Sequence, residues 1–336
     1  MTTPRRDGFR MPAEWSPHAA TYMEWPTTTR AEFWADRFET AKRDYATVAN
    51  AIAAFEPVIM LVRPEQLDEA RKLCGGGVDL LPMEIDDSWM RDNGPIFVTN
   101  ARGEVALVKF GFNAWGEKFA PWDLDATVPE RLATHLGMRR YAAPMVLEGG
   151  SFFVDGEGTL ITTEQCLLNP NRNPSMTRED IEGVLRDYLG VDVVVWLMNG
   201  HPQDRDTDGH IDGILQYVGP GVVMLHLPAD PSDPGHLDMR ENLRRLEVAR
   251  DAAGRSFEVI PFEPGASAAA VMNFYLCNGG AIVPIHHAEV DEPALAQVRA
   301  AFPEREVVSV PGETILYGGG GPHCITQQLP VGVPAA

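Results

Sequence analysis

A chain of 336 residues, 44% of them hydrophobic, is long and apolar enough to bury a substantial core in one large domain or two ordinary ones. Its formal net charge of −20, from 48 acidic and 28 basic residues, argues against nucleic acid and anionic membranes as partners. The sequence has no apolar run near the length of a membrane span and no apolar leader behind its first residues, so we expect a cytoplasmic protein.

The N-terminal part of the chain predicts strands and helices in alternation. Residues 9–30 are rich in proline and aromatic side chains and indicate an extended segment that contains a short strand. Apolar residues then recur at three- and four-residue steps from Phe38 to Ile52, which predicts a helix that ends before Pro57. Residues 58–62 have the length and β-branching of a buried strand, and a helix near 65–74 and a strand near 78–83 follow.

From residue 96 onward one pattern returns: a hairpin around a Gly or Asn turn, an amphipathic helix and a hydrophobic strand. The predicted turns are 100–103, 155–158, 219–221 and 278–280. The predicted helices lie near 126–136, 239–252 and 292–301, and one more begins at Thr177, which Asp180 would help to cap. The predicted strands are 141–147, 191–197, 257–262 and 306–310. A last hairpin from Ile315 and Leu316 onward, closed by the N-terminal strand and helix, would make a fifth unit. The sequence therefore predicts an α/β protein of repeated modules.

Each module has a polar residue at or near the start of its hairpin, at spacings of roughly 50 to 65 residues: Asp92, Glu148, His210 with Asp212, Asn273 and Cys324. Modules repeated around a closed ring place equivalent positions near one axis, so a ring would bring these side chains together. The alternative is a plain α/β sheet in which they cap strands.

Cys324 follows four consecutive glycines, Gly318 to Gly321, which allow positive φ and a close approach of the backbone to a ligand. The same run also fits a simple turn beside a small buried cysteine. The four cysteines show neither metal-ligand spacing nor a disulfide framework. Those at positions 74, 166 and 277 lie in predicted helix or hairpin contexts and are expected to be structural.

A site that contains one cysteine, one histidine and several carboxylates is a poor environment for a resting thiolate, because carboxylates raise the pKa of a neighbouring thiol. A cationic substrate reverses this effect. A planar guanidinium binds carboxylates bidentately, its charge favours the thiolate, and its central carbon is open to attack. One histidine can protonate the departing ammonia and later accept a proton from water.

The chain resembles the agmatine deiminase family of the guanidine-modifying, or pentein, superfamily along nearly its whole length. The matching segments are Met11-Pro12-Ala13-Glu14-Trp15 with Pro17-His18, Asp87-Ser88-Trp89-Met90-Arg91-Asp92, Phe112-Asn113-Ala114-Trp115-Gly116, Leu147-Glu148-Gly149-Gly150-Ser151, Glu164-Gln165-Cys166-Leu167-Leu168-Asn169 with Arg172-Asn173-Pro174, Asp206-Thr207-Asp208-Gly209-His210-Ile211-Asp212 and His323-Cys324-Ile325-Thr326-Gln327-Gln328. The common order of these segments makes the resemblance specific.

The resemblance implies a five-bladed α/β propeller in a single catalytic domain over residues 1–336, with a flexible tail from about residue 331. It also implies hydrolysis of a small cationic guanidine, foremost agmatine, without a metal or another cofactor, in a homo-oligomer. The residue roles that it implies are Cys324 as nucleophile, His210 as general acid and then base, Asp92 and Asp212 as ligands of the guanidinium, Glu148 as the residue that orients His210, Asp206 as a further substrate ligand, and Trp89 as a stacking wall of the pocket.

The chain departs from the family pattern at three places. Gly321 and Pro322 stand where the family usually has Asn and an aliphatic residue, Gly213 stands where Asn is common, and the segment 262–273 is short. These departures bear on the tail of the substrate.

Other readings of the same residues stay open at this point. The substrate is alternatively arginine, a peptide arginine or a guanidino acid, and Arg172 and Arg205 are then the candidate carboxylate ligands. An amine in place of water would make the reaction an amidino transfer, and a non-catalytic or metal-dependent binder of polyamines belongs to a different class. The same residues also have interpretations that involve no catalysis. Asp92 would then form a local ion pair with Arg91, and Glu148 would be a turn residue. His210 and Asp212 would be part of a metal site, and His286 and His287 are interpreted as loop residues.

Overall fold

Four similar three-strand units follow one another along the chain, as the repeat predicted. The structure is a computed structural model that describes residues 2–263 and 270–335. Each unit pairs an antiparallel hairpin with a parallel third strand. The strands are β5 (Ile96–Asn100), β6 (Glu104–Gly111) and β7 (Arg140–Val146); β8 (Phe152–Val154), β9 (Thr159–Thr163) and β10 (Val193–Leu197); β11 (Leu215–Gly219), β12 (Val222–His226) and β13 (Glu258–Phe262); and β14 (Tyr275–Cys277), β15 (Gly280–Ile285) and β16 (Glu306–Pro311).

A fifth sheet is built from both ends of the chain. β17 (Thr326–Pro330) pairs antiparallel with β2 (His18–Glu24), and β3 (Val58–Val62) and β4 (Val78–Pro82) extend the sheet in parallel. The prediction that the N-terminal strand and helix close a last unit is therefore confirmed. Two short strands, β1 (Phe9–Arg10) and β18 (Val333–Pro334), add to the sheet of β5 and β6.

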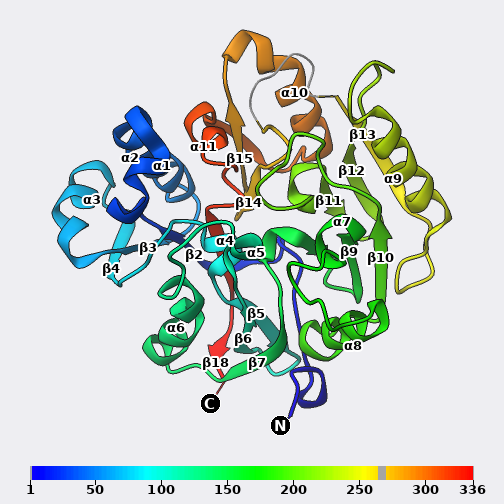
Figure 1. The fold of residues 1–336 in the computed structure, drawn as a ribbon, viewed down its shortest axis with the longest axis horizontal. Coiled ribbons are helices and arrows are strands. Elements are labelled where there is room, and N and C mark those ends of the chain that lie inside the picture. Colours follow the sequence, from blue (N-terminus) through cyan, green and yellow to red (C-terminus); the bar gives the residue numbers. More distant parts are fainter. Residues whose placement is uncertain (1, 264–269, 336) are drawn as a thin grey trace.

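The longer helices lie outside the sheets, and the short helices α4 and α5 lie near the centre of the molecule (Figure 1). In each unit a long helix connects the second strand to the parallel third strand. These helices are α2 (Phe38–Ile52), α6 (Val128–Leu136), α8 (Arg178–Leu189), α9 (His236–Val248) and α10 (Ala288–Ala301). The remaining α-helices are α1 (Ala31–Trp34), α3 (Leu67–Leu73), α4 (Met90–Asn93), α5 (Ala114–Glu117), α7 (Glu164–Leu167) and α11 (Glu313–Tyr317).

Local sequence explains where these helices lie. The apolar face predicted for α2 is buried, with Ala41, Tyr45, Val48 and Ile52 all 0% exposed. The predicted cap of α8 is a capping box, in which the Thr177 side chain accepts from the Asp180 amide and the Asp180 carboxylate accepts from the Thr177 amide.

The apolar core lies between neighbouring sheets. The cluster around α8 contains side chains from the β5–β7 sheet and the β8–β10 sheet, and two further clusters join β8–β10 to β11–β13 and β11–β13 to β14–β16. Another cluster joins β14–β16 to the β2–β3 sheet, and the last joins that sheet back to β5 and β6. Core packing therefore runs from sheet to sheet and returns to the first, which excludes the plain single sheet that the sequence left open.

One local prediction was wrong. Residues 313–317 form the helix α11 between Gly312 and Gly318 and not the first strand of a hairpin; Ile315 is fully buried, and the strand begins only at Thr326. Near the end of the described residues, β18 pairs with β6 and the Ala335 carbonyl accepts from the Arg139 amide. Within the described residues, no helix has the length and apolar character needed to cross a membrane.

Candidate active site

The polar residues predicted to meet precede the strands of four different sheets and are buried together. Asp92 lies on α4, Glu148 ends the connection from β7 to β8, His210 and Asp212 precede β11, and Cys324 precedes β17. Each of these side chains is at most 5% exposed. The structure thus brings together residues separated by more than two hundred positions in the chain.

Gly150 marks the point where three of them converge. A Cβ atom built on Gly150 would lie 2.7 Å from His210 Nδ1, 2.8 Å from Asp212 Oδ2 and 2.9 Å from Asp92 Oδ1. Two carboxylates and an imidazole therefore face one small volume, which only a residue without a side chain leaves free. This is the geometry that a planar cation with several N–H donors requires.

Asp92 is held by two hydrogen bonds. Its Oδ1 atom accepts from the Gly150 amide at 2.9 Å, and its Oδ2 atom accepts from Trp115 Nε1 at 2.9 Å. Burial raises the pKa of Asp92, the charges of Asp212 and Glu148 add to the rise, and His210 opposes it. The ordinary local ion pair with Arg91 is absent from the described residues, because Arg91 instead donates to the His323 carbonyl and to Gln328.

Trp115 reaches Asp92 from a left-handed turn. Ala114, Trp115, Gly116 and Glu117 have φ values of 50°, 56°, 88° and 63°, which non-glycine residues rarely adopt. Asn113 stabilises the turn, because its side chain accepts from the Gly116 amide and its carbonyl accepts from the Glu117 amide. The strained backbone therefore serves to position the indole N–H at the carboxylate.

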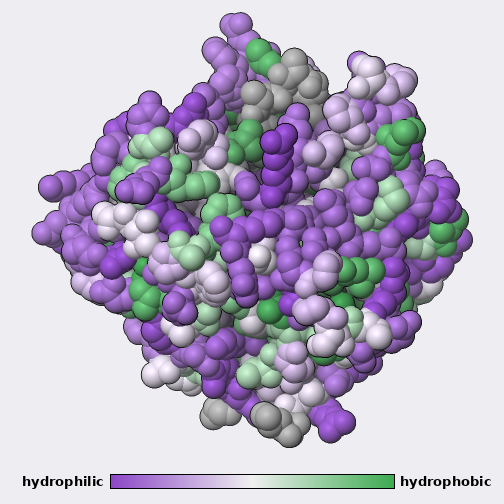
Figure 2. All heavy atoms as spheres, viewed as in Figure 1, coloured by the Kyte–Doolittle hydropathy of each residue, from purple (hydrophilic) through white to green (hydrophobic). Residues whose placement is uncertain are grey.

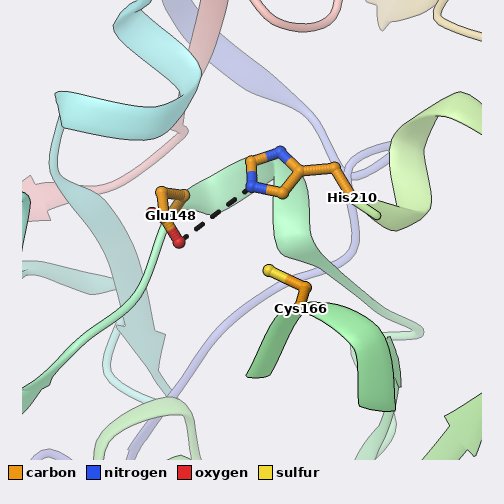
Figure 3. Close-up of side chains that lie close together, drawn as sticks. All are labelled: Glu148, Cys166 and His210. Atoms are coloured by element: carbon orange, nitrogen blue, oxygen red, sulfur yellow. Dashed lines mark ion pairs between the residues drawn. The ribbon is translucent and has the colours of Figure 1, made fainter. Parts of the chain in front are cut away.

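Glu148 and His210 face each other in a region with few partners (Figure 3). His210 Nε2 lies 4.0 Å from Glu148 Oε2, and His210 Nδ1 lies 3.8 Å from Asp92 Oδ1, so neither pair is at hydrogen-bond distance. Both ring nitrogens and Glu148 Oε2 are buried without a hydrogen-bond partner among the residues that the structure describes. Buried polar atoms in proteins are rarely left this way, which makes these atoms the natural contacts of a bound ligand.

The other carboxylate oxygen of Glu148 accepts a hydrogen bond from Arg172. Arg172 Nε donates to Glu148 Oε1 at 2.6 Å, and the same guanidinium donates to Asp208, to Asn171 and to the Thr207 carbonyl. Its side chain is 0% exposed and does not line either cavity of the site. Arg172 thus fixes Glu148 and the loop before His210, and it is not available to bind a substrate carboxylate.

Cys166, on α7, points its Sγ atom toward the space between Glu148 and His210 (Figure 3). The three donor atoms lie within 4.8 Å of one another, and a carboxylate, an imidazole and a thiolate are ligands that zinc accepts. Two features disfavour a metal there. Burial raises the pKa of the Cys166 thiol well above its ordinary value, and the Arg172 cation already occupies the other oxygen of Glu148.

The nucleophile candidate is a buried thiol beside a carboxylate. Cys324 Sγ lies 3.4 Å from Asp212 Oδ2, and its backbone amide donates to Asn273 Oδ1 at 3.2 Å. Burial raises the pKa of Cys324 well above its ordinary value, and the charges of Asp212 and Asp92 add to this rise. A bound cation would oppose this rise in pKa, because its positive charge favours the thiolate.

The glycine run allows the close approach that the sequence predicted. A Cβ atom on Gly320 would lie 2.7 Å from the Trp89 ring and 2.9 Å from Cys324 Sγ, and Gly319 has a φ of 102°. At Gly321 a Cβ atom would lie 2.8 Å from Asn273 Oδ1, the atom that holds the Cys324 amide. A side chain at position 321 would therefore crowd the Asn273 oxygen that holds the amide of the nucleophile, whereas glycine leaves this contact free.

Cys324 lies where two cavities meet. The first has aromatic and acidic walls: Phe33, Trp89, Trp115, Phe119, Asp87, Asp92 and Asp206, with Thr207, Gly318, Gly319 and Cys324. The second lies on the side of His210 and Asp212 and is also lined by Arg205 and the pair His201 and His226. Hydrophilic residues predominate around the centre of this face of the molecule (Figure 2).

Trp89 and Asp206 both line the first cavity, and Asp206 also lines the second. Trp89 is 5% exposed and also stacks on Trp34 at 6.3 Å, so it belongs to both the pocket and the core. Burial raises the pKa of Asp206. Lys118 donates to the carbonyls of Arg205 and Asp206 and thereby ties their loop to the left-handed turn.

Sequence reasoning missed several residues of the site. Trp115 stood in a matching segment but had no role assigned, and the strained turn that aims it has no signature beyond Asn113 and Gly116. Glu14 and His323 also stood in matching segments. The contacts of His323 with Asp212 and with Glu14 depend on tertiary structure alone. His286 and His287 precede α10 outside both cavities, as expected for loop residues.

Known proteins resemble this chain along almost its full length. The sequence model of the Porphyromonas-type peptidyl-arginine deiminase family matches residues 10–330. The agmatine deiminases of Ectopseudomonas mendocina (strain ymp) and Pseudomonas aeruginosa (strain UCBPP-PA14) are each 44% identical to it over 98% of this chain and 97% of their own. Both alignments span 361 positions, more than the 336 residues of this chain, so these relatives contain residues that it lacks.

Solved structures agree with this relationship. The agmatine deiminase of Enterococcus faecalis is 35% identical, with a TM-score of 0.94 over 98% of each chain. DDAH from Pseudomonas aeruginosa shares the α/β fold with a TM-score of 0.52 at 13% identity. The resemblance seen in the sequence is confirmed, and the chain belongs to the Porphyromonas-type peptidyl-arginine deiminase family.

Proposed function

We propose that this protein hydrolyses the guanidino group of agmatine to N-carbamoylputrescine and ammonia. The observation that carries the proposal is the convergence of Asp92, Asp212 and His210 around Gly150, next to the thiol of Cys324. The agmatine deiminases that are 44% and 35% identical to the chain support the same reaction.

In this proposal the guanidinium binds between Asp92 and Asp212. Its remaining N–H groups point at Glu148 Oε2, which has no hydrogen-bond partner in the described part of the chain. Its positive charge lowers the pKa of Cys324, which burial and the two aspartates otherwise raise. Binding and activation are thus the same event, because the thiol becomes a nucleophile only when the cation is in place.

The chemistry then proceeds through a covalent intermediate. The thiol proton passes to His210, Sγ attacks the guanidinium carbon, and the C–N bond breaks as His210 returns the proton to the departing nitrogen, which leaves as ammonia. Water adds to the carbon of the amidino-thioether, His210 accepts its proton, and the C–S bond breaks. The ureido product leaves, and Cys324 regains a proton.

The walls of the first cavity favour an amine at the tail of the substrate. Its charged residues are all acidic, and four aromatic rings surround them, which suits an alkyl ammonium better than a carboxylate. Of the two arginines considered for a carboxylate, Arg172 is fully engaged and Arg205 lines only the second cavity. Asp206 lines both cavities and is the residue that we expect to contact the amine. In this proposal Trp89 forms the apolar wall beside the alkyl chain of the substrate.

The architecture suits a central site. The structure has five sheets, and apolar clusters join each sheet to the next and the last sheet to the first. This arrangement fits a five-bladed α/β propeller in one catalytic domain over residues 1–336. The short segment 262–273, expected to shape the site, falls partly on residues 264–269, which lie outside the described residues.

The test is release of ammonia from agmatine, arginine, guanidinobutyrate and a peptide with an internal arginine, by the wild type and Cys324→Ala, with and without a chelator. We expect turnover of agmatine that survives the chelator and disappears in the variant. Turnover of arginine or the peptide alone would overturn the substrate, and activity that the chelator removes or that Cys324→Ala retains would overturn the mechanism.

A further inference from the structure

A line of buried side chains leads from the nucleophile to the N-terminal segment. Cys324 Sγ lies 3.4 Å from Asp212 Oδ2, the same oxygen lies 2.9 Å from His323 Nδ1, and His323 Nε2 lies 2.8 Å from Glu14 Oε2. All four side chains are at most 5% exposed. The reaction proposed above uses Cys324 and Asp212, but it gives no role to His323 or Glu14.

The pairing at both ring nitrogens makes His323 a cation. A neutral imidazole has one donor and one acceptor nitrogen, whereas the imidazolium donates from both, which two carboxylate partners require. Burial and the nearby Arg91 lower the pKa of His323, but Glu14 and Asp212 overcome them and raise it above its ordinary value. The fixed charges that face this ring are thus Glu14, Asp212 and Arg91.

Glu14 is anchored by elements other than its own. Its Oε1 atom accepts from the Leu276 amide of β14 at 3.0 Å and from Gln216 Nε2 of β11 at 3.3 Å, and Arg91 Nη2 lies 4.0 Å from Oε2. Its pKa is lowered despite burial, through the charge and hydrogen bond of His323 and the charge of Arg91. Glu14 is therefore a fixed anion that orients His323.

Asp212 needs this support, because a second carboxylate faces the same small volume. Two buried carboxylates near one point repel, and one of them normally takes up a proton. Burial alone would raise the pKa of Asp212, but the hydrogen bond and charge of His323, with the charge of His210, hold it below its ordinary value. Asp92, which has no such partner, has a raised pKa.

We propose that Glu14 and His323 are positioning residues that keep Asp212 ionised and aim its Oδ2 atom at Cys324 and at the substrate guanidinium, an inference that rests on the function proposed above. They act through Asp212 and do not touch the substrate. The N-terminal segment thereby sets the affinity of a site built mostly by the rest of the chain.

The test uses binding without turnover. Calorimetric titration of agmatine into Cys324→Ala, Glu14→Gln with Cys324→Ala, and His323→Gln with Cys324→Ala is carried out from pH 5 to pH 9. We expect the acid limb of the affinity profile to move up by about one pH unit in both double variants, so that affinity at the acid end falls about tenfold and converges with the parent at high pH.

Glu56→Gln with Cys324→Ala is the matched control. Glu56 is buried to the same 4% as Glu14 and pairs with the ring of a buried histidine, His18, at 3.0 Å, but it makes no contact with Asp212. It should lower the unfolding temperature without moving the binding profile.

The outcomes separate the two proposals. A pH-independent loss of affinity in both double variants, or a profile identical to that of Cys324→Ala, would assign Glu14 and His323 to structure alone and refute the positioning role. Absence of agmatine binding to Cys324→Ala itself would refute the proposed function and not the positioning of Asp212 by Glu14 and His323. Unfolding midpoints of every variant show whether misfolding accounts for the result. His323→Gln provides a second, independent perturbation of the contacts that connect Glu14 to Asp212.

Discussion

Gly150 is the residue on which the geometry of the site depends most. Because a Cβ atom there would lie under 3 Å from His210, Asp212 and Asp92, Gly150→Ala should push at least one of these side chains out of place. A displacement of about 1 Å in a catalytic group typically costs about a hundredfold in rate, and we expect a loss of that order in kcat/KM for agmatine. Steady-state ammonia release measures it.

Gly183→Ala is the control for this substitution. Gly183 lies on α8, and a Cβ atom there would meet nothing within 4 Å, so this variant should keep full activity and gain slightly in stability. Wild-type kcat/KM in a folded Gly150→Ala protein would show that the three side chains have room to move, and that the convergence is not what the reaction needs.

At the scale of elements, the left-handed turn at 114–117 exists to bring one N–H group to Asp92. Trp115→Phe keeps an aromatic ring but removes that donor, so the pKa of Asp92 should rise further and its hold on the guanidinium should weaken. A hydrogen bond to a charged group contributes about 1.5–3 kcal/mol, which predicts a kcat/KM at least roughly tenfold lower, with the largest loss at low pH. Kinetics between pH 6 and pH 9 test this expectation.

A second tryptophan supplies the comparison. Trp196 Nε1 also donates to a carboxylate, Glu182 Oε1, at the same 2.9 Å, but Glu182 lies on α8, away from both cavities. Trp196→Phe should therefore leave the pH profile of kcat/KM unchanged. If both variants changed the profile alike, the loss would have to be assigned to general packing.

For the whole molecule, two buried acids make stability depend on pH. Burial and the neighbouring charge of Asp87 raise the pKa of Asp125 to about 8, and burial with the charge of Asp125 raises the pKa of Glu24 well above its ordinary value. The folded state then binds more protons than the unfolded state between about pH 4 and pH 8, so the free energy of unfolding should fall as pH rises through this window.

Glu24→Gln should remove much of this dependence. An amide does not ionise, so the variant should unfold at higher denaturant than the wild type at pH 9, by about 1–3 kcal/mol, with little gain at pH 5. Glu304→Gln, at an exposed acid, should behave as the wild type. Equal denaturation midpoints for Glu24→Gln and the wild type at pH 9 would mean that Glu24 is ionised in the folded protein at little cost.

Much of the architecture follows from local sequence. Hydrophobic periodicity and turn residues predicted the hairpins, the helix α2 and the capped start of α8, because these features depend on neighbours a few residues away. The regular return of one polar residue per module also predicted that Asp92, Glu148, His210, Asp212 and Cys324 would meet. Local pattern was wrong at α11, where burial of Ile315 against the rest of the core outweighs its β-branching.

Tertiary structure alone decided how those residues act. The sequence determined which reactive groups are present, namely the thiol of Cys324, the imidazole of His210 and the carboxylates of Asp92, Glu148 and Asp212, and hence a chemistry suited to a guanidinium. Only the fold decided that Arg172 serves Glu148 and not the substrate, that Trp115 serves Asp92, and that His323 and Glu14 support Asp212. The physical reason is that hydrogen bonds and charges act over a few ångströms in space, whatever the distance along the chain.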